Sequence, residues 1–321
     1  MITYRKRSVI FLVAIAFVVA GGVAPLFAGG QSEGDAATEA QGDRQDWPDK
    51  LVFAAVPTED EEIISRRYAD LMSYLERRLG VETEMYFPTS YMGTIEAMRT
   101  GNVDVAKLGP FSYILAAERA NPEMFAVPTD VGETPTYYSA FITLEGSGID
   151  ELSDLEGKRV AFADPASTSG HLFPRAAIVN DLGIENDSIE NFFGETSFSG
   201  SHQASASAVL NGDVDAAPIS SGSGFRSLEG PLSDHPNADK VVVFYRTGDI
   251  PSDGYVLRRE LPEDFRAAVR GAFYDAVNDP ELEAFFEDIG TAGFIRRSDA
   301  DYNIIRETAR AIEMSPEELM D

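Results

Sequence analysis

The chain has 321 residues, of which 44% are hydrophobic, and this length suits two domains with buried cores. It contains no cysteine, which excludes disulfides, thiolate metal sites, a cysteine nucleophile and a lipid-modified cysteine. Its 54 acidic residues outnumber its 26 basic residues and give a formal charge of −28, so no basic face is available for nucleic acid.

Residues 1–28 are predicted to be a secretory signal peptide. Three basic residues, Arg5 to Arg7, precede an apolar stretch at 9–20, and the segment from Pro25 to Ala28 offers a cleavage site after the small residue Ala28. A retained membrane anchor is the alternative interpretation. Residues 29–48 are acidic and poor in apolar side chains, which predicts a disordered linker. We therefore expect a periplasmic or secreted protein that is not a lipoprotein.

The next segments alternate between strand and helix patterns. The segment 61–80 has apolar residues at helical spacing from Ile64 to Leu79 and ends at Gly80. Strands are expected at 51–57, 81–88, 103–110 and 125–131, and helices at 61–80, 89–101 and 111–121. Alternation of this kind predicts an α/β fold with a mostly parallel sheet that is covered on both faces.

The same order of elements returns later in the chain. Residues 158–165 are expected to form a strand, a helix follows and ends at Gly183, and 205–220 repeat the pattern of 95–110. We infer two lobes with one α/β plan. Lobe 1 is assigned to 49–135 plus 246–321 and lobe 2 to 136–245, with closing helices at 263–277, 280–290 and 300–312. A cleft between such lobes is the expected place for a small ligand.

A turn rich in hydroxyl groups joins the second-lobe strand to its helix. Ser167, Thr168 and Ser169 are followed by Gly170. A helix start exposes unpaired backbone N–H groups and carries partial positive charge, and glycine allows a close approach to the backbone. The turn therefore predicts an oxyanion site that needs no lysine or arginine. Ordinary capping of the helix by one hydroxyl is the alternative.

Five segments together resemble the periplasmic phosphonate- and phosphite-binding proteins that feed ATP-binding-cassette (ABC) importers. They are 90–110, 136–143, 164–174, 200–217 and 250–254. The resemblance implies a type II periplasmic binding protein with two crossover strands, which closes about a hinge on a small phosphorus oxyanion. It implies an ABC permease as partner and no metal or cofactor, and we expect a monomer.

The resemblance also implies a set of ligand contacts. These are Tyr91, Tyr137, Ser167, Thr168, Ser169, Gly170, His202 and Asp253, with Ser220 and Ser221 as further candidates. Gly222 stands where members that take aminoalkyl phosphonates carry an acid. This difference disfavours 2-aminoethylphosphonate and favours phosphite, phosphate or methylphosphonate.

Each contact has an alternative interpretation. The tyrosines could belong to the core, His202 could cap a helix, and Asp253 could be a turn residue. If Asp253 faces the ligand, an acidic O–H on the anion could donate to it, so we hypothesise that binding selects a protonated form of the ligand.

Other functions are less well supported by the sequence. The chain has three histidines and no metalloprotease, Walker, G-x-S-x-G or G-x-G-x-x-G motif, which argues against an enzyme. A different solute in the same fold, such as a sulfonate or a thiamine precursor, and a ligand-sensing role in a receptor system both stay open.

Overall fold

The structure is a computed structural model that describes residues 46–129 and 135–314. The predicted signal peptide and most of the predicted linker lie outside the described residues. Within the described part, no helix is both long and apolar enough to span a membrane. Trp47, which falls in the predicted linker, donates to Asp264 over 2.6 Å and packs against Phe265 with 4.9 Å between ring centroids. Packing against the fold therefore begins before residue 49.

Lobe 1 is built on a six-stranded sheet with the order β13-β4-β12-β3-β1-β2. Its strands are β1 (Lys50–Ala55), β2 (Glu82–Tyr86), β3 (Val105–Leu108), β4 (Glu123–Thr129), β12 (Gly254–Leu257) and β13 (Gly293–Arg296). Strands β1 to β4 share one direction, and β12 and β13 run against them.

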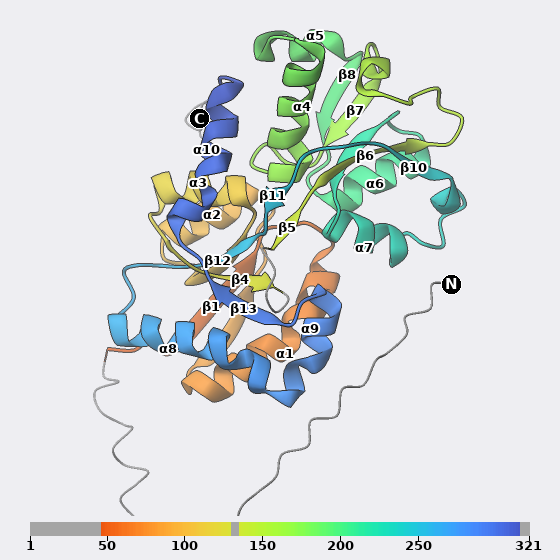
Figure 1. Ribbon diagram of the computed structural model, residues 1–321. Helices are drawn as coiled ribbons and strands as arrows, with labels where there is room; N and C mark the ends of the chain where they lie inside the picture. The colour runs from red at the N-terminus through yellow and green to blue at the C-terminus, as the bar shows by residue number, and fades with distance from the viewer. Residues whose placement is uncertain (1–45, 130–134, 315–321) are drawn as a thin grey trace, which may run out of the picture. The chain divides into compact units, whose positions relative to one another are not determined.

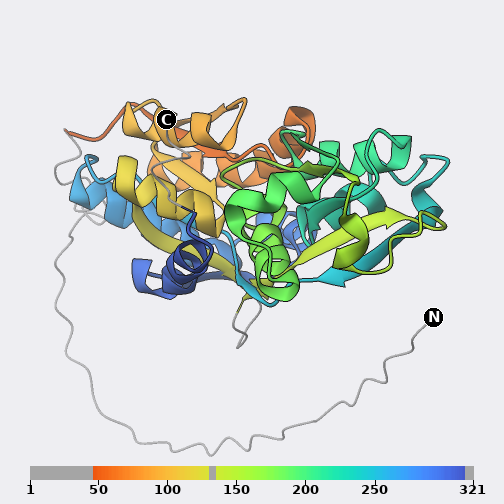
Figure 2. The ribbon, with the colours of Figure 1, turned by 90° about the horizontal axis from the view of Figure 1, so that it is seen from above.

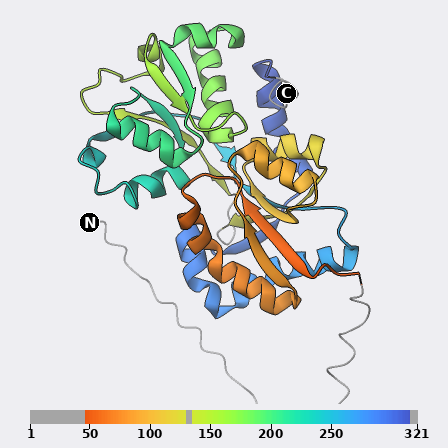
Figure 3. The ribbon, with the colours of Figure 1, turned by 180° about the vertical axis from the view of Figure 1, so that it is seen from behind.

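Helices cover both faces of this sheet (Figures 1 and 3). They are α1 (Glu61–Leu79), α2 (Tyr91–Arg99), α3 (Pro110–Arg119), α8 (Glu263–Asp275), α9 (Glu283–Ile289) and α10 (Asn303–Ala311). Alternate residues of β1 serve opposite faces. Phe53 belongs to the cluster formed with α1, α8 and α9, whereas Ala54 belongs to the cluster formed with α2, α3 and α10.

Lobe 2 repeats this plan with a smaller sheet. Its elements are β6 (Ser139–Leu144), β7 (Arg159–Phe162), α4 (Phe173–Leu182), α5 (Ile189–Phe192), β8 (Glu195–Phe198), α6 (His202–Asn211), β9 (Ala217–Ser220), α7 (Ser223–Glu229) and β10 (Val241–Arg246). A bridge between Val160 and Ala216 links the β7-β8 pair to the β10-β6-β9 sheet, in which only β6 runs against the others. Phe141 faces α4 and α5, and Ile142 faces α6 and α7.

Two short strands carry the chain between the lobes. β5 (Thr136–Tyr137) pairs antiparallel with β11 (Ile250–Pro251). β5 leads into β6, and β11 follows β10 and leads into β12. Short 3₁₀ turns complete the fold at Leu152–Leu155, Asn186–Ser188, Ala238–Lys240, Ala276–Asn278, Pro280–Leu282 and Asp299–Tyr302. The predicted α/β class, mostly parallel by strand direction and with two crossovers, is confirmed, while the exact lobe boundaries stay a prediction.

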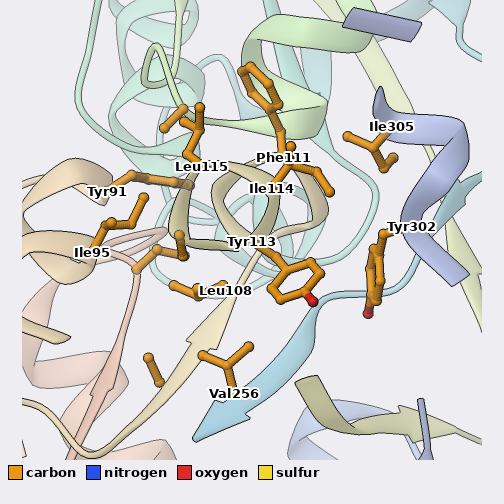
Figure 4. Close-up of a cluster of buried hydrophobic side chains, with 14 of the residues drawn as sticks. Tyr91, Ile95, Leu108, Phe111, Tyr113, Ile114, Leu115, Val256, Tyr302 and Ile305 are labelled. Atoms are coloured by element: carbon orange, nitrogen blue, oxygen red, sulfur yellow. The ribbon is translucent and has the colours of Figure 1, made fainter. Parts of the chain in front are cut away.

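One apolar cluster includes residues from both lobes. Figure 4 shows part of it, with Tyr91 on α2, Phe111 on α3 and Ile305 on α10. Leu172 and Ala176, which belong to lobe 2, are buried in the same cluster. Helix α10 accordingly lies beside α4 (Figures 1 and 2). The C-terminal helix therefore packs against both lobes.

Gly194 provides a test of the β7-β8 pairing. A Cβ built on Gly194 would lie 2.3 Å from the carbonyl oxygen of Gly157, so Gly194→Ala forces two backbone segments apart. We expect the free energy of unfolding to fall by about 1–3 kcal/mol, measured by urea denaturation.

Gly271 is the matched control for this substitution. It lies inside α8 with nothing within 4 Å of an added Cβ. Gly271→Ala should raise the free energy of unfolding by about 0.5–1 kcal/mol, because alanine favours a helix interior over glycine. Equal stability of Gly194→Ala and the unchanged protein would show that the segments are not packed as described.

Candidate functional site

Four helices of nine or more residues begin at one small cavity between the lobes, and the seven-residue α7 begins there as well. The cavity has a volume of about 20 Å³. It is lined by Tyr91, the first residue of α2, by Gly109, the N-cap of α3, by Ser167, the N-cap of the helix that continues into α4, and by His202, the first residue of α6. Because a helix carries partial positive charge at its N-terminus, all four helices favour an anion in this cavity.

The turn predicted from three hydroxyl groups forms one wall of the cavity. It begins as a π-helical turn, Thr168–Leu172, which continues directly into α4; turns of this kind are frequent at functional sites. Ser167 Oγ accepts from the N–H of Gly170 over 3.0 Å, so Ser167 does cap the helix. The N–H groups of Thr168 and Ser169 occupy the first helical positions, which have no partner inside a helix.

Hydrogen bonds between the lobes surround the cavity. Thr168 Oγ1 accepts from the N–H of Phe111, at the start of α3, over 2.8 Å. Its own hydroxyl hydrogen therefore stays available to a ligand. Nearby, Ser112 Oγ donates to the carbonyl of Ala166 over 2.8 Å, and the N–H of Tyr91 donates to Asp164 over 3.3 Å. The lobes are thus in contact on this side of the cavity.

His202 has a defined protonation state. Its Nδ1 accepts from the N–H of Ser220 over 3.2 Å, so the single proton of the neutral ring must lie on Nε2. Nε2 is 3.4 Å from Ser169 Oγ, at the cavity wall. Burial lowers the pKa of His202 to about 4. The histidine is therefore a neutral N–H donor at pH 7.

Two tyrosines contribute hydroxyl groups from lobe 1 and from the crossover. Tyr91 is buried, and its hydroxyl has no hydrogen-bond partner among the described residues. Tyr137, on β5, lines the same cavity. Burial is the main cause that raises the pKa of both hydroxyls well above the ordinary value. Both tyrosines stay protonated and can donate to an anion.

Asp253 also lines the cavity, and Lys107 balances its charge. Lys107 Nζ lies 2.6 Å from Asp253 Oδ2. Burial lowers the pKa of Lys107, but Asp253 raises it by more, and the net direction is upward, so the lysine stays charged. Lys107 thus gives one oxygen of the Asp253 carboxylate a cationic partner, while the hypothesis that an acidic O–H of the ligand donates to Asp253 stays a prediction.

The structure brings most of the predicted site residues together. The cavity lining includes Tyr91, Tyr137, Ser167, Thr168, Ser169, His202, Ser220 and Asp253. Gly170 lies just outside the lining, and a Cβ on it would stand 2.4 Å from the Cβ of Ala163, so internal packing already requires glycine there. Ser221 also lies outside the cavity lining, and its Oγ accepts from the N–H of Tyr138 over 3.1 Å.

Sequence reasoning missed several lining residues. Val56, Thr58, Gly109 and Ser223 line the cavity, and Lys107 stands behind Asp253. Gly109 lies near the end of the predicted strand 103–110 and just before the predicted helix 111–121, a junction of strand and helix like the one at 167–170. The other residues had no comparable signal.

A larger cavity of about 310 Å³ adjoins the small one. The two share Val56, Thr58, Tyr137, Ser220, Ser223 and Asp253. Three basic residues, Arg67, Lys107 and Arg226, line the larger cavity, whereas none lines the small one. Among the described residues, no cluster of three or more potential metal ligands occurs.

Comparisons with known proteins agree with this geometry. The family model described as "ABC transporter, phosphonate, periplasmic substrate-binding protein" matches residues 53–302. The phosphonates-binding periplasmic protein of Escherichia coli is 30% identical over 269 residues, which are 82% of this chain and 77% of that protein. The phosphate-import protein PhnD of Mycolicibacterium smegmatis is 35% identical over 176 residues, and the match spans 53% of this chain and about half, 54%, of that relative.

Solved structures show the same fold. The binding component of a phosphonate ABC transporter from Pseudomonas aeruginosa aligns with a TM-score of 0.74 at 24% identity, over 82% of this chain and 86% of that one. PhnD1 of Prochlorococcus marinus, solved in complex with methylphosphonate, aligns with a TM-score of 0.72 at 22% identity. The alignment covers 84% of this chain and 100% of that one. With a family model that covers most of its length, this chain belongs to the periplasmic substrate-binding proteins of phosphonate ABC transporters, a family of binding proteins rather than enzymes.

Proposed function

We propose that this protein captures a small phosphorus oxyanion, namely phosphite, methylphosphonate or phosphate, in the cavity between its lobes and delivers it to an ABC permease. The observation that supports this best is the meeting of four helix N-termini at the small cavity. Backbone dipoles and hydroxyl groups there supply the attraction that basic side chains supply elsewhere.

The size of the small cavity favours a compact head group. A volume of about 20 Å³ is only slightly more than the roughly 10–15 Å³ that one water needs. A tetrahedral oxyanion is larger than one water, so it has to use part of the adjoining cavity as well, and only a compact head group suits this end of the site. This arrangement supports recognition of the phosphoryl group itself.

The donors suit an ionised ligand despite the charge of the chain. Ser167, Thr168 and Ser169 offer hydroxyl groups, and His202 offers the N–H on Nε2. These donors act at contact distance, whereas the acidic surface is screened by salt beyond about 8–10 Å. The local donors can therefore outweigh the formal charge of −28.

Capture would depend on closure of the lobes. Lobe 1 contributes Tyr91, lobe 2 contributes Thr168 and His202, and the crossovers contribute Tyr137 and Asp253. A ligand that contacts all of them stabilises the closed state over any open one. In this proposal, a monomer exported to the periplasm by a signal peptide presents its closed form to the permease.

Thr168 provides the first test of the proposal. Thr168→Val preserves the shape of the side chain but removes a donor to the ligand and the acceptor for the N–H of Phe111. We expect the binding free energy for methylphosphonate to weaken by about 1–3 kcal/mol, measured by isothermal titration calorimetry.

Thr143→Val is the matched control, because Thr143 is buried in lobe 2 and donates to the carbonyl of Asp215 instead. It should lower stability and leave affinity unchanged. Phosphite, phosphate and methanesulfonate are titrated in parallel, and tight binding of the sulfonate alone would contradict the proposal.

The buried histidines give a second test through pH. An unfolded histidine is protonated below about pH 6.5, whereas burial lowers the pKa of His202 and of His171 to about 4. Between these values the unfolded state binds more protons, so stability falls as the pH decreases. Each histidine should reduce the free energy of unfolding by about 2 kcal/mol between pH 7 and pH 5.

Two substitutions separate the roles of the histidines. His202→Gln and His171→Phe should each flatten the dependence of the urea midpoint on pH, and only His202→Gln should weaken methylphosphonate binding. His171 lies against the rings of Phe162 and Phe198, with centroids 5.3 and 5.0 Å away, so a phenyl ring suits its site. An unchanged pH dependence in both variants would show that neither histidine is buried in its neutral form.

A further inference from the structure

The two cavities can hold different parts of one ligand, with the head group in the small cavity and its substituent in the large one. They share six lining residues, among them Tyr137, Ser220 and Asp253, so a group bound in the small cavity can extend into the large one. The large cavity, at about 310 Å³, far exceeds what a methyl group needs. Its walls therefore decide which substituents the protein accepts.

The walls of the large cavity reverse the charge balance of the chain. Acidic residues outnumber basic residues by 54 to 26 in the sequence. Among the described residues that line this cavity, Arg67, Lys107 and Arg226 are basic and Asp253 is acidic. These described side chains favour an anionic substituent over a cationic one, to an extent that depends on how far each cation is already paired within the protein.

The three cations differ in how fully they are paired. Arg67 donates to both carboxylate oxygens of Glu59 and also to Asp288. Lys107 pairs with Asp253. Both side chains are therefore satisfied within the protein, and neither has a strong need for an acceptor on the ligand.

Arg226, on α7, is the exception. Among the described residues, the carboxylate closest to it is that of Glu59, at 4.0 Å, and both oxygens of that carboxylate already accept from Arg67. The Nε of Arg226 is buried and has no hydrogen-bond partner among the described residues. A buried N–H without an acceptor is unfavourable, and a carboxylate is the acceptor that matches the planar guanidinium.

Gly222 leaves room beside this guanidinium. A Cβ built on Gly222 would lie 3.3 Å from Ser220 Oγ and 3.7 Å from Nη1 of Arg226, and Gly222 and Arg226 both line the large cavity. An acidic side chain at position 222 would pair with Arg226 internally. Glycine leaves Arg226 free to pair with a ligand instead.

We propose that the large cavity is a subsite for an anionic substituent, so that the preferred organic ligands are phosphonates that carry a second acidic group, such as carboxyalkyl phosphonates. The phosphoryl head binds at the four helix N-termini, and the carboxylate binds at Arg226. This inference rests on the proposed function and adds a substrate class to it.

Calorimetry with matched ligands tests the inference. Methylphosphonate carries the head group with a minimal substituent, and phosphonoacetate, ethylphosphonate and 2-aminoethylphosphonate add an anionic, a neutral and a cationic group of similar length. We expect phosphonoacetate to bind at least about tenfold more tightly than ethylphosphonate, and 2-aminoethylphosphonate to bind most weakly. Equal or reversed ranking of these three would overturn the inference.

A variant of Arg226 tests whether this residue is the source of the preference for an anionic substituent. Arg226→Gln should weaken the affinity for phosphonoacetate about 10- to 100-fold. It should change the affinity for methylphosphonate by no more than about threefold. Arg159→Gln is the control, because Arg159 belongs to the same lobe, carries the same charge and lines neither cavity. A loss of the same size in the control, or a uniform loss for all ligands in Arg226→Gln, would overturn the assignment to Arg226.

Gly222→Asp gives the converse test. The new carboxylate should pair with Arg226, so phosphonoacetate should lose its advantage and 2-aminoethylphosphonate should gain affinity, while methylphosphonate binding persists. Binding of methylphosphonate throughout distinguishes failure of the subsite from failure of the proposed function. If the unchanged protein binds none of the phosphorus oxyanions, both proposals are wrong.

Discussion

The alignment of four helix N-termini on one point is the constraint on which the rest of this molecule depends. It follows from the fold, because α2, α3, the helix of α4 and α6 each come directly after a strand, β2, β3, β7 and β8 respectively. Strands that share a direction place the helices that follow them at one edge of each sheet. When two such edges face each other, the dipoles of the helices that begin there converge. An acidic chain can then attract an anion without a basic side chain in contact with it.

Recognition is thereby divided between backbone and side chains. The backbone geometry of the small cavity is shared by every ligand with the same head group, so it gives affinity with little discrimination between substituents. The larger cavity is lined by side chains that single substitutions can change, such as Arg226 and Gly222. If the proposed division holds, specificity within this architecture can change without disturbing the proposed head-group site.

Much of this arrangement could be predicted from local patterns. Long periodic segments such as 61–80, and glycines such as Gly183, marked helices that the structure contains. Strands β12 and β13 have four residues each and no alternation to reveal them, and their place depends on pairing with distant strands. The Lys107–Asp253 pair was missed for the same reason, since it exists only because β12 runs antiparallel beside β3.

The position of α10 has a mechanical consequence. The helix is anchored in lobe 1 through α3, yet Ile305 shares a buried cluster with Leu172 and Ala176 of lobe 2. Separation of the lobes would either expose that shared apolar surface to water or pull α10 away from α3. Both changes cost free energy because they expose apolar side chains to water. If the lobes open and close as proposed, this contact of α10 with both lobes would favour the closed form of the unloaded protein and slow the release of a bound ligand.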